Sequence, residues 1–337
     1  MKHFAVMGAL LASAAAVPAM ADDVVIGTFG GSFGAAVAEC HIAPFEAATG
    51  DSVVVQEGSS SQFASMIRAT GGQSDFDVVY IDNSFGTQLG NEDLVEPLDH
   101  AKLPASAALD ARVWGPNDSF VQFMWAATAL AYNPELVDTP PTSWSAVFDP
   151  AYKGKVALPD ISGTAGVHFL IAAARLNGGD IDNLDPGFEA IAKIAPDVQA
   201  YYTQADQLIG MFERGEIAMA PWYTDRAAAA AASGVPVKIA YPTEGGIGIN
   251  VTLIIPKGAA NPEGAYKFID TILSPESQSC LAEKMYEGPV NPETKLEGAA
   301  AEAVPTAAYP TLYFPDPEKV AAGVGDWRAR WQREITR

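Results

Sequence analysis

The chain of 337 residues carries 41 acidic and 20 basic side chains, which gives a formal net charge of −21, and 49% of its residues are hydrophobic. A chain this acidic is a poor partner for nucleic acids or anionic membrane surfaces, so we expect neither. The length suggests two domains at roughly 150 residues each.

The first residues are typical of a secretory signal. Residues 1–3 form a short basic region, and the apolar run 4–17 is too short to span a bilayer comfortably. Ala19 and Ala21 offer small side chains at the two positions that a signal peptidase reads. We therefore predict that residues 1–21 are a signal peptide, cleaved after Ala21, and that the mature protein is periplasmic.

A glycine-rich loop follows the first predicted strand, in the stretch VVIGTFGGSFGAAVAE at 24–39. Between a strand and a helix, such a loop brings backbone N–H groups close to a ligand, with the helix dipole behind them. The phosphate-binding signature needs a Gly-Lys-Ser/Thr ending, which is missing here, and the dinucleotide spacing is not met either. The loop therefore predicts a polar ligand without indicating a nucleotide.

Strand and helix patterns alternate along the rest of the chain. Strands are expected at 53–57, 77–82, 155–160, 216–222, 235–242 and 251–257, the first two of them buried. Helices are expected around 62–68, 166–176, 187–195, 205–214, 225–233, 262–273 and 275–286. The uncharged stretch 123–132 predicts a central strand that crosses between domains. This alternation indicates the α/β class with mainly parallel sheets.

Polar residues follow three of the predicted strands, at 28–32, 82–84 and 160–164. Ligands of parallel α/β sheets collect at the carboxyl ends of the strands. These three segments are therefore the candidate binding loops.

The chain has two cysteines, Cys40 and Cys280, which in an oxidising compartment form either a disulfide or two separate buried thiols. Past the predicted signal, His41, His100 and His168 stand far apart and show no metal-ligand spacing. No nucleophile elbow is present. We therefore expect no metal site, no cofactor and no catalytic residue, and predict that the protein is not an enzyme.

Three ordered motifs are more specific. They are SWSAVFDPAYKGKVALPD (143–160) followed by SGTAG, RGEIAMAPWYTDRAAA (214–229), and YPTEGGIGINVTLIIPKGAANPEGAYKFIDTILSPESQ (241–278). Together they resemble the bacterial extracellular solute-binding proteins of the spermidine/putrescine type, which serve ABC importers. The likeness runs from Val24 to the tail GDWRARW at 325–331.

The resemblance implies a two-lobed periplasmic-binding-protein fold. Each lobe is a mainly parallel sheet flanked by helices, and two hinge strands join the lobes around a ligand cleft. It assigns 22–128 plus 250–300 to lobe one and 129–249 plus 301–337 to lobe two. Both cysteines then lie in lobe one, which favours the disulfide. The implied role is that of a monomer that closes on a small amine or amino acid and delivers it to an inner-membrane ABC permease.

The strand ends and the resemblance together define a set of expected ligand-binding residues. They are Phe29, Gly30, Gly31, Ser32, Ser59, Asp82, Asn83, Trp125, Asp160, Thr164, Trp222, Tyr223, Asp225, Arg226 and Asn250. The glycines let the backbone approach the ligand, and Phe29 or Phe33 offers an aromatic wall. Trp222 is expected to be a cleft wall, and Trp125 either a ligand contact or hinge packing.

The chain departs from the family pattern in ways that affect the ligand. Polyamine binders of this type hold an ammonium with an aromatic residue and an aspartate, and these positions are Ile249 and Val251 here. Arg226 is either a carboxylate clamp or a surface helix arginine. With Asp82 or Asp160 taking an ammonium, the expected ligand shifts from polyamines toward an ω-amino acid such as γ-aminobutyrate.

Two other functions remain as alternatives. A ferric-iron or other small-anion binding protein of the same fold would place adjacent tyrosines where this chain has Trp222 and Tyr223, so only one phenolate is present. A secreted hydrolase would need a nucleophile–base pair or a close carboxylate pair. The candidate carboxylates Asp82, Asp160 and Asp225 come from three separate loops, and no histidine accompanies them.

Overall fold

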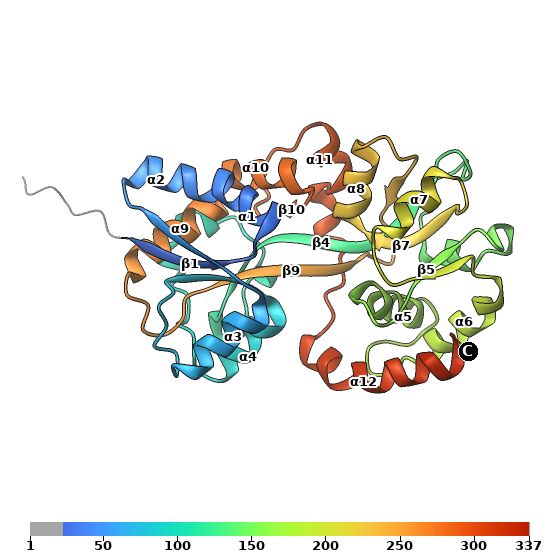
Figure 1. The fold of residues 1–337 in the computed structure, drawn as a ribbon, viewed down its shortest axis with the longest axis horizontal. Helices are drawn as coiled ribbons and strands as arrows, with labels where there is room; N and C mark the ends of the chain where they lie inside the picture. Colours follow the sequence, from blue (N-terminus) through green and yellow to red (C-terminus); the bar gives the residue numbers. More distant parts are fainter. Residues whose placement is uncertain (1–22, 337) are drawn as a thin grey trace, which may run out of the picture.

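We analysed a computed structural model of the chain, which describes residues 23–336 (Figure 1). The predicted signal peptide lies outside these residues. The strands are β1 Val24–Thr28, β2 Val53–Glu57, β3 Val78–Asp82, β4 Val121–Tyr132, β5 Ala157–Pro159, β6 Ala200–Tyr202, β7 Met219–Tyr223, β8 Lys238–Ala240, β9 Ile247–Ile254 and β10 Gly288–Pro289. The α-helices are α1 Gly31–Val37, α2 Ala43–Thr49, α3 Ser60–Ala69, α4 Asn83–Asn91, α5 Thr164–Leu176, α6 Asp185–Ile194, α7 Gln207–Glu213, α8 Thr224–Ala232, α9 Pro262–Leu273, α10 Pro275–Met285, α11 Gly298–Ala303 and α12 Pro317–Glu334. Across 23–336, no helix combines the length and apolar character needed to cross a membrane.

The chain forms two lobes, as predicted, and β4 and β9 run between them (Figure 1). In lobe one, α1, α2, α9 and α10 cover one face of the sheet, and α3 and α4 cover the other. In lobe two, one apolar core contains α5, α6 and α12, and a second contains α7 and α8. Each lobe is therefore a sheet between helical layers. Every residue of β4 is buried, as expected for a central strand.

Strand direction is more mixed than the sequence predicted. β1 pairs in parallel with β2 and β3, and β5 pairs in parallel with β6. Each antiparallel ladder contains β4 or β9. The parallel pairings therefore lie within each lobe, and the strands that connect the lobes introduce the antiparallel ones.

The prediction of a buried strand at 53–57 is wrong in one respect. β2 is a strand, but it lies at the edge of the sheet, and Val54 and Val55 are 47% and 44% exposed. β-branched residues favour strands whether or not a helix covers them, so composition alone did not distinguish an edge strand from a central one.

A third segment also passes between the lobes. Ala303, Val304, Ala308, Tyr309 and Leu312 pack in the core of lobe one, and Tyr313 packs against that of lobe two. The change of lobe was expected at residue 301 from the sequence. Tyr313 pairs with β9 through two backbone bonds: Gly248 N–H to its carbonyl at 2.8 Å and its own N–H to the Gly246 carbonyl at 2.9 Å. Further along, Glu318 of α12 accepts a 2.8 Å hydrogen bond from Asn91 of α4.

Gly248 is required where this segment crosses β9. A Cβ at Gly248 would lie 2.1 Å from Cε1 of Phe314. We expect Gly248→Ala to lower the free energy of unfolding by about 2 kcal/mol, because the ring must move out of its packed position. Urea unfolding would measure this. Gly325→Ala is the matched control, since Gly325 has open space around it on α12 and alanine favours helices there. Equal stability of Gly248→Ala and wild type would contradict the prediction.

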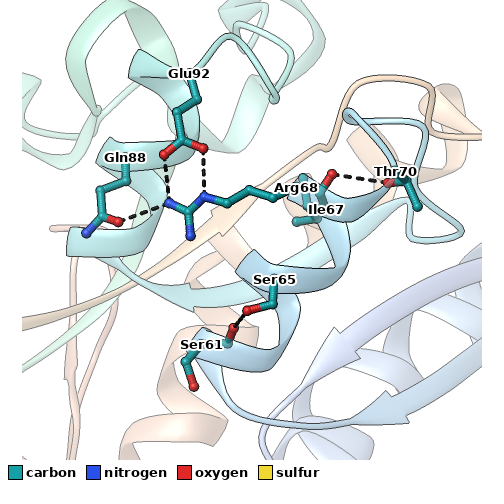
Figure 2. Close-up of polar contacts among 7 residues, drawn as sticks. All are labelled: Ser61, Ser65, Ile67, Arg68, Thr70, Gln88 and Glu92. Carbon is teal, nitrogen blue, oxygen red and sulfur yellow. Dashed lines mark hydrogen bonds and ion pairs between the residues drawn. The ribbon is translucent and has the colours of Figure 1, made fainter.

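Two links fix helices in lobe one. Cys40, in the π-turn Ala38–Ile42, is disulfide-bonded to Cys280 of α10, as predicted. On the other face, Arg68 of α3 binds Glu92 at 2.7 and 2.8 Å and Gln88 at 3.0 Å, which joins α3 to α4 (Figure 2). The helix pair α3 and α4 carries Ser59 and Asp82 at its N-termini.

Candidate functional site

The register of β4 and β9 brings parts of both lobes onto one surface. In β4, Met124, Ala126 and Thr128 lie opposite Val251, Ile249 and Ile247 of β9. At one end of this set Asp82 pairs with Val251, and at the other Tyr223 pairs with Thr128. Because side chains alternate along a strand, these eight residues share one face of the sheet. We call them the hinge face.

Contacts on the two sides of the sheet support this assignment. On the hinge face, α5 of lobe two packs over Thr128, whose hydroxyl lies 2.9 Å from Nδ1 of His168. On the opposite face lie Trp125 and Gly248, against Tyr309 and Phe314 of the C-terminal segment.

The hinge face has an apolar floor and accessible polar walls. Met124, Ala126 and Thr128 are at most 8% exposed, whereas Asp82 is exposed and Tyr223 partly so. From the row of Asp82 to the row of Tyr223, β4 advances four residues, about 14 Å at 3.4 Å per residue, and β9 and β4 lie between β3 and β7. Asp82 of lobe one and Tyr223 of lobe two therefore stand on opposite sides of the floor over Ala126, and a ligand that spans this floor can touch both.

Asp82 is held at the junction of two helices. Its Oδ2 accepts a 2.9 Å hydrogen bond from the Ser60 hydroxyl, and its backbone N–H donates to the same hydroxyl at 3.1 Å. Although the residue is exposed, the protein around its carboxylate removes part of the water there, which raises the pKa of Asp82, and the Ser60 bond lowers it. Asn83 begins α4 beside it. Ser59 is the N-cap of α3, with its hydroxyl accepting from the Gln62 N–H, so this side chain already has a structural partner.

The glycine-rich loop also has a structural role beside the ligand-binding one expected from the sequence. A Cβ at Gly30 would lie 2.6 Å from Oε2 of Glu57, and one at Gly34 would lie 3.1 Å from Oε1. These glycines make room for the chain's own carboxylate beside the start of α1. Gly31 has φ +68°, which glycine tolerates best. Near them, Phe29 packs on Phe33, and Gly31 and Ser32 are exposed.

In lobe two, one of the free backbone N–H groups at the start of α5 already has a hydrogen-bond partner within the protein. The N–H of Ala165 donates to the Tyr223 hydroxyl at 3.0 Å. Asp160 accepts a 2.9 Å bond from the Ser162 N–H, which shapes the turn before the helix. Thr164, the first residue of α5, is exposed. Tyr223 and Thr164 are therefore the accessible groups at this point.

Both candidate tryptophans are core residues in this structure. Trp125 is fully buried and its Nε1 donates to the Pro289 carbonyl at 2.9 Å, which fits the alternative of hinge packing. Trp222 is 1% exposed and stacks on Phe212, so it forms no wall of a binding site here. Asn250 pairs with Trp125 and therefore lies on the face opposite the hinge face.

The start of α8 carries charged groups near the hinge face. Burial raises the pKa of Asp225, and Arg226 lowers it. The Arg226 Nε is 3.7 Å from Asp225 Oδ2, and the Arg226 side chain is 59% exposed. Arg226 is thus free to turn toward a ligand at little cost.

Glu287 is an ionisable residue near Asp225 that the sequence did not single out. Burial raises its pKa well above the ordinary value, Asp225 raises it further and Arg226 lowers it. The residue follows a helix in the stretch MYEGPV, which reads as an ordinary loop. No local signal could have found it, because its surroundings come from β4 and α8.

Metal ligands do not gather in the described part of the chain. Within 23–336, no group of three or more His, Cys, Asp or Glu side chains could hold a metal ion. The adjacent tyrosines at 201 and 202 lie in β6, where the Tyr202 hydroxyl donates to the Pro221 carbonyl at 2.5 Å.

Comparison with known proteins identifies relatives along most of the chain. Residues 41–310 match the family model of the bacterial extracellular solute-binding proteins. The spermidine/putrescine-binding periplasmic protein of Escherichia coli is 27% identical over 271 residues, 77% of this chain and 73% of that protein. The gamma-aminobutyric acid-binding protein of Pseudomonas aeruginosa is 26% identical over 313 residues, 88% of this chain and 86% of that protein. The crystal structure of an ABC transporter protein from Clostridium perfringens superposes with a TM-score of 0.79 at 25% identity, covering 93% of this chain and 99% of that one.

Proposed function

This chain belongs to the bacterial extracellular solute-binding protein family, and from that premise we propose that it captures a small amine-containing solute in the periplasm for an inner-membrane ABC permease. The solute class is a polyamine or an ω-amino acid such as γ-aminobutyrate. The names of the two relatives support this class, since one is a spermidine/putrescine-binding and the other a gamma-aminobutyric acid-binding protein.

The observation that carries the proposal is the hinge face. It combines an apolar floor over Ala126 with Asp82 from lobe one and Tyr223 from lobe two. A carboxylate and an aromatic ring are suited to an ammonium group and its methylene chain. A ligand that touches both lobes stabilises the arrangement in which both contacts form, so capture proceeds by closure of the lobes.

The family role also favours binding without chemistry. Histidine is the commonest general base, and His41 and His168 are both buried in the cores. We propose that the protein works as a monomer after loss of the predicted signal peptide and has no catalytic function.

A thermal-shift screen of the mature protein tests the solute class. We expect a raised melting temperature with putrescine, spermidine or γ-aminobutyrate, since a ligand that binds only the folded state stabilises it by mass action. A shift with ferric citrate or simple carboxylates, and with none of the amines, would refute the proposal in favour of the small-anion alternative.

Two substitutions test separately the residues proposed to bind the amine end and the carboxylate end of the ligand. We expect Asp82→Asn to weaken binding of the active amine by about 1.5–3 kcal/mol, because a charge-assisted hydrogen bond is lost. Arg226→Ala should weaken binding only of solutes that carry a carboxylate. Arg214→Ala is the matched control, since Arg214 is exposed and pairs with Glu216 on lobe two. Isothermal titration would measure each affinity, and an unchanged affinity of Asp82→Asn for every amine would contradict the assigned role of Asp82.

A further inference from the structure

Glu287 lies where the chain leaves α10 and enters β10. Tyr286 ends α10 in the left-handed region at φ 54°, and Gly288 then pairs with Trp125. The next position along β4 is Ala126, which belongs to the hinge face. Since β10 and β9 flank β4 on opposite edges, Glu287 stands beside the hinge face at the edge away from β9.

The strands β7 and β10 meet end to end along this edge of β4. β7 reaches Thr128 with its last residue, and β10 begins at Trp125. Only Ala126 and Ala127 lie between, and the Ala127 N–H donates to the Thr224 hydroxyl at 3.1 Å. Thr224 begins α8 and Asp225 follows it. A carboxylate of lobe one and a carboxylate of lobe two therefore face the same short gap.

The Glu287 side chain is partly buried, and one oxygen of its carboxylate has no compensating hydrogen bond. Its Oε2 is a buried atom with no hydrogen-bond partner among residues 23–336. The nearby charges are Asp225, which repels it, and Arg226, whose exposed side chain lies against Asp225. A buried, unpaired acid is costly for a fold, and such groups occur where a ligand completes their environment.

The geometry defines the chemistry of that ligand group. The gap lies over Ala126, whose side chain ends at Cβ, so a small group can enter it. An ammonium brings three N–H donors and a positive charge, whereas a carboxylate would add a further negative charge beside two acids. We propose that Glu287 and Asp225 together bind one protonated amine of the solute at the β10 edge of β4, so that this amine links lobe one to lobe two, while Asp82 on β3 stands at a separate position for a second amine.

This inference rests on the proposed function and explains how the ligand drives closure. Without ligand, the charge of Asp225 opposes ionisation of Glu287 across the lobes. A bound ammonium attracts both carboxylates. Both contacts form only when the lobes are closed, so the ligand stabilises the closed state. Val251, which replaces the aspartate expected in polyamine binders, is then not the position at which this chain supplies its ammonium-binding acid.

Isothermal titration of wild type, Glu287→Gln and Glu283→Gln with putrescine and with γ-aminobutyrate tests the inference. We expect Glu287→Gln to bind the active amine about 100-fold more weakly than wild type, the loss typical of a hydrogen bond to a charged group. Glu283→Gln should match wild type, because Glu283 is exposed on α10 one turn earlier. The melting temperature of ligand-free Glu287→Gln should equal or exceed that of wild type, which shows that weak binding does not come from misfolding.

The outcomes separate the two proposals. If wild type binds an amine and Glu287→Gln binds it within about threefold of the wild-type affinity, the role of Glu287 is refuted and the proposed function stands. If wild type binds neither amine, the proposed function itself fails. Asp225→Asn is a second variant that keeps the test informative should Glu287→Gln fail to fold, and it too should weaken amine binding.

Discussion

Removing the disulfide between Cys40 and Cys280 will lower the free energy of unfolding by about 5 kcal/mol, because the bond restricts a very long loop in the unfolded chain. The two cysteines are 240 residues apart in sequence. For a protein of this size the loss corresponds to a fall in melting temperature of about 8 °C. The bond also anchors α10, the helix that leads to Glu287.

Urea unfolding of the oxidised and the reduced protein measures this effect. The double variant Cys40→Ala, Cys280→Ala is the matched control: it should start from the stability of the reduced protein and show no response to reductant. Alanine is chosen instead of serine because Cys40 is fully buried, and a serine hydroxyl there would need a hydrogen-bond partner. If reduction leaves the wild-type midpoint unchanged, the disulfide contributes nothing to stability and the prediction is wrong.

Lowering the pH from about 7.5 to about 5 will cost the folded protein about 4 kcal/mol through two buried histidines, roughly 2 kcal/mol from each. Burial lowers the pKa of His41 to about 3 and that of His168 to about 4. The fold therefore favours neutral imidazole, while the unfolded chain takes up protons below about pH 6.5. Their stabilising contribution is complete above that pH and falls progressively toward pH 4 and 3.

Urea unfolding at both pH values, with His41→Gln and His168→Gln, isolates this contribution. Each variant lacks one hydrogen bond of the wild type, that of His41 to Tyr80 or that of His168 to Thr128. On acidification, however, its free energy of unfolding should fall by about 2 kcal/mol less than that of wild type. Glu287 has the opposite effect on stability: because its pKa is raised, the folded state takes up a proton more readily than the unfolded chain as the pH falls. This contribution is the same in wild type and in the histidine variants, so it cancels when their acid sensitivities are compared. Identical acid sensitivity in wild type and in both variants would refute the histidine mechanism.

The candidate site was only partly accessible from the sequence. Asp82 and Tyr223 could be found because each follows a recognisable strand, and the structure places both on the hinge face. Trp222 could not be assigned correctly, since an aromatic residue at a strand end looks the same whether it faces a ligand or a core. Glu287 was missed for the converse reason: a loop glutamate looks exposed until β4 and α8 are placed around it.

The sequence by itself determined many of the strands and helices and the α/β class, because steric and hydrophobic preferences act between neighbouring residues and produce local periodicity. Its ordered motifs also indicated the family, and through that resemblance the two lobes and a disulfide between Cys40 and Cys280. Three features became known only from the tertiary structure: the antiparallel pairing of β4 with β9, the close approach of Phe314 to Gly248, and the proximity of Glu287 to Asp225. Those depend on register between segments far apart in the chain, where one residue of slip turns every side chain to the other face.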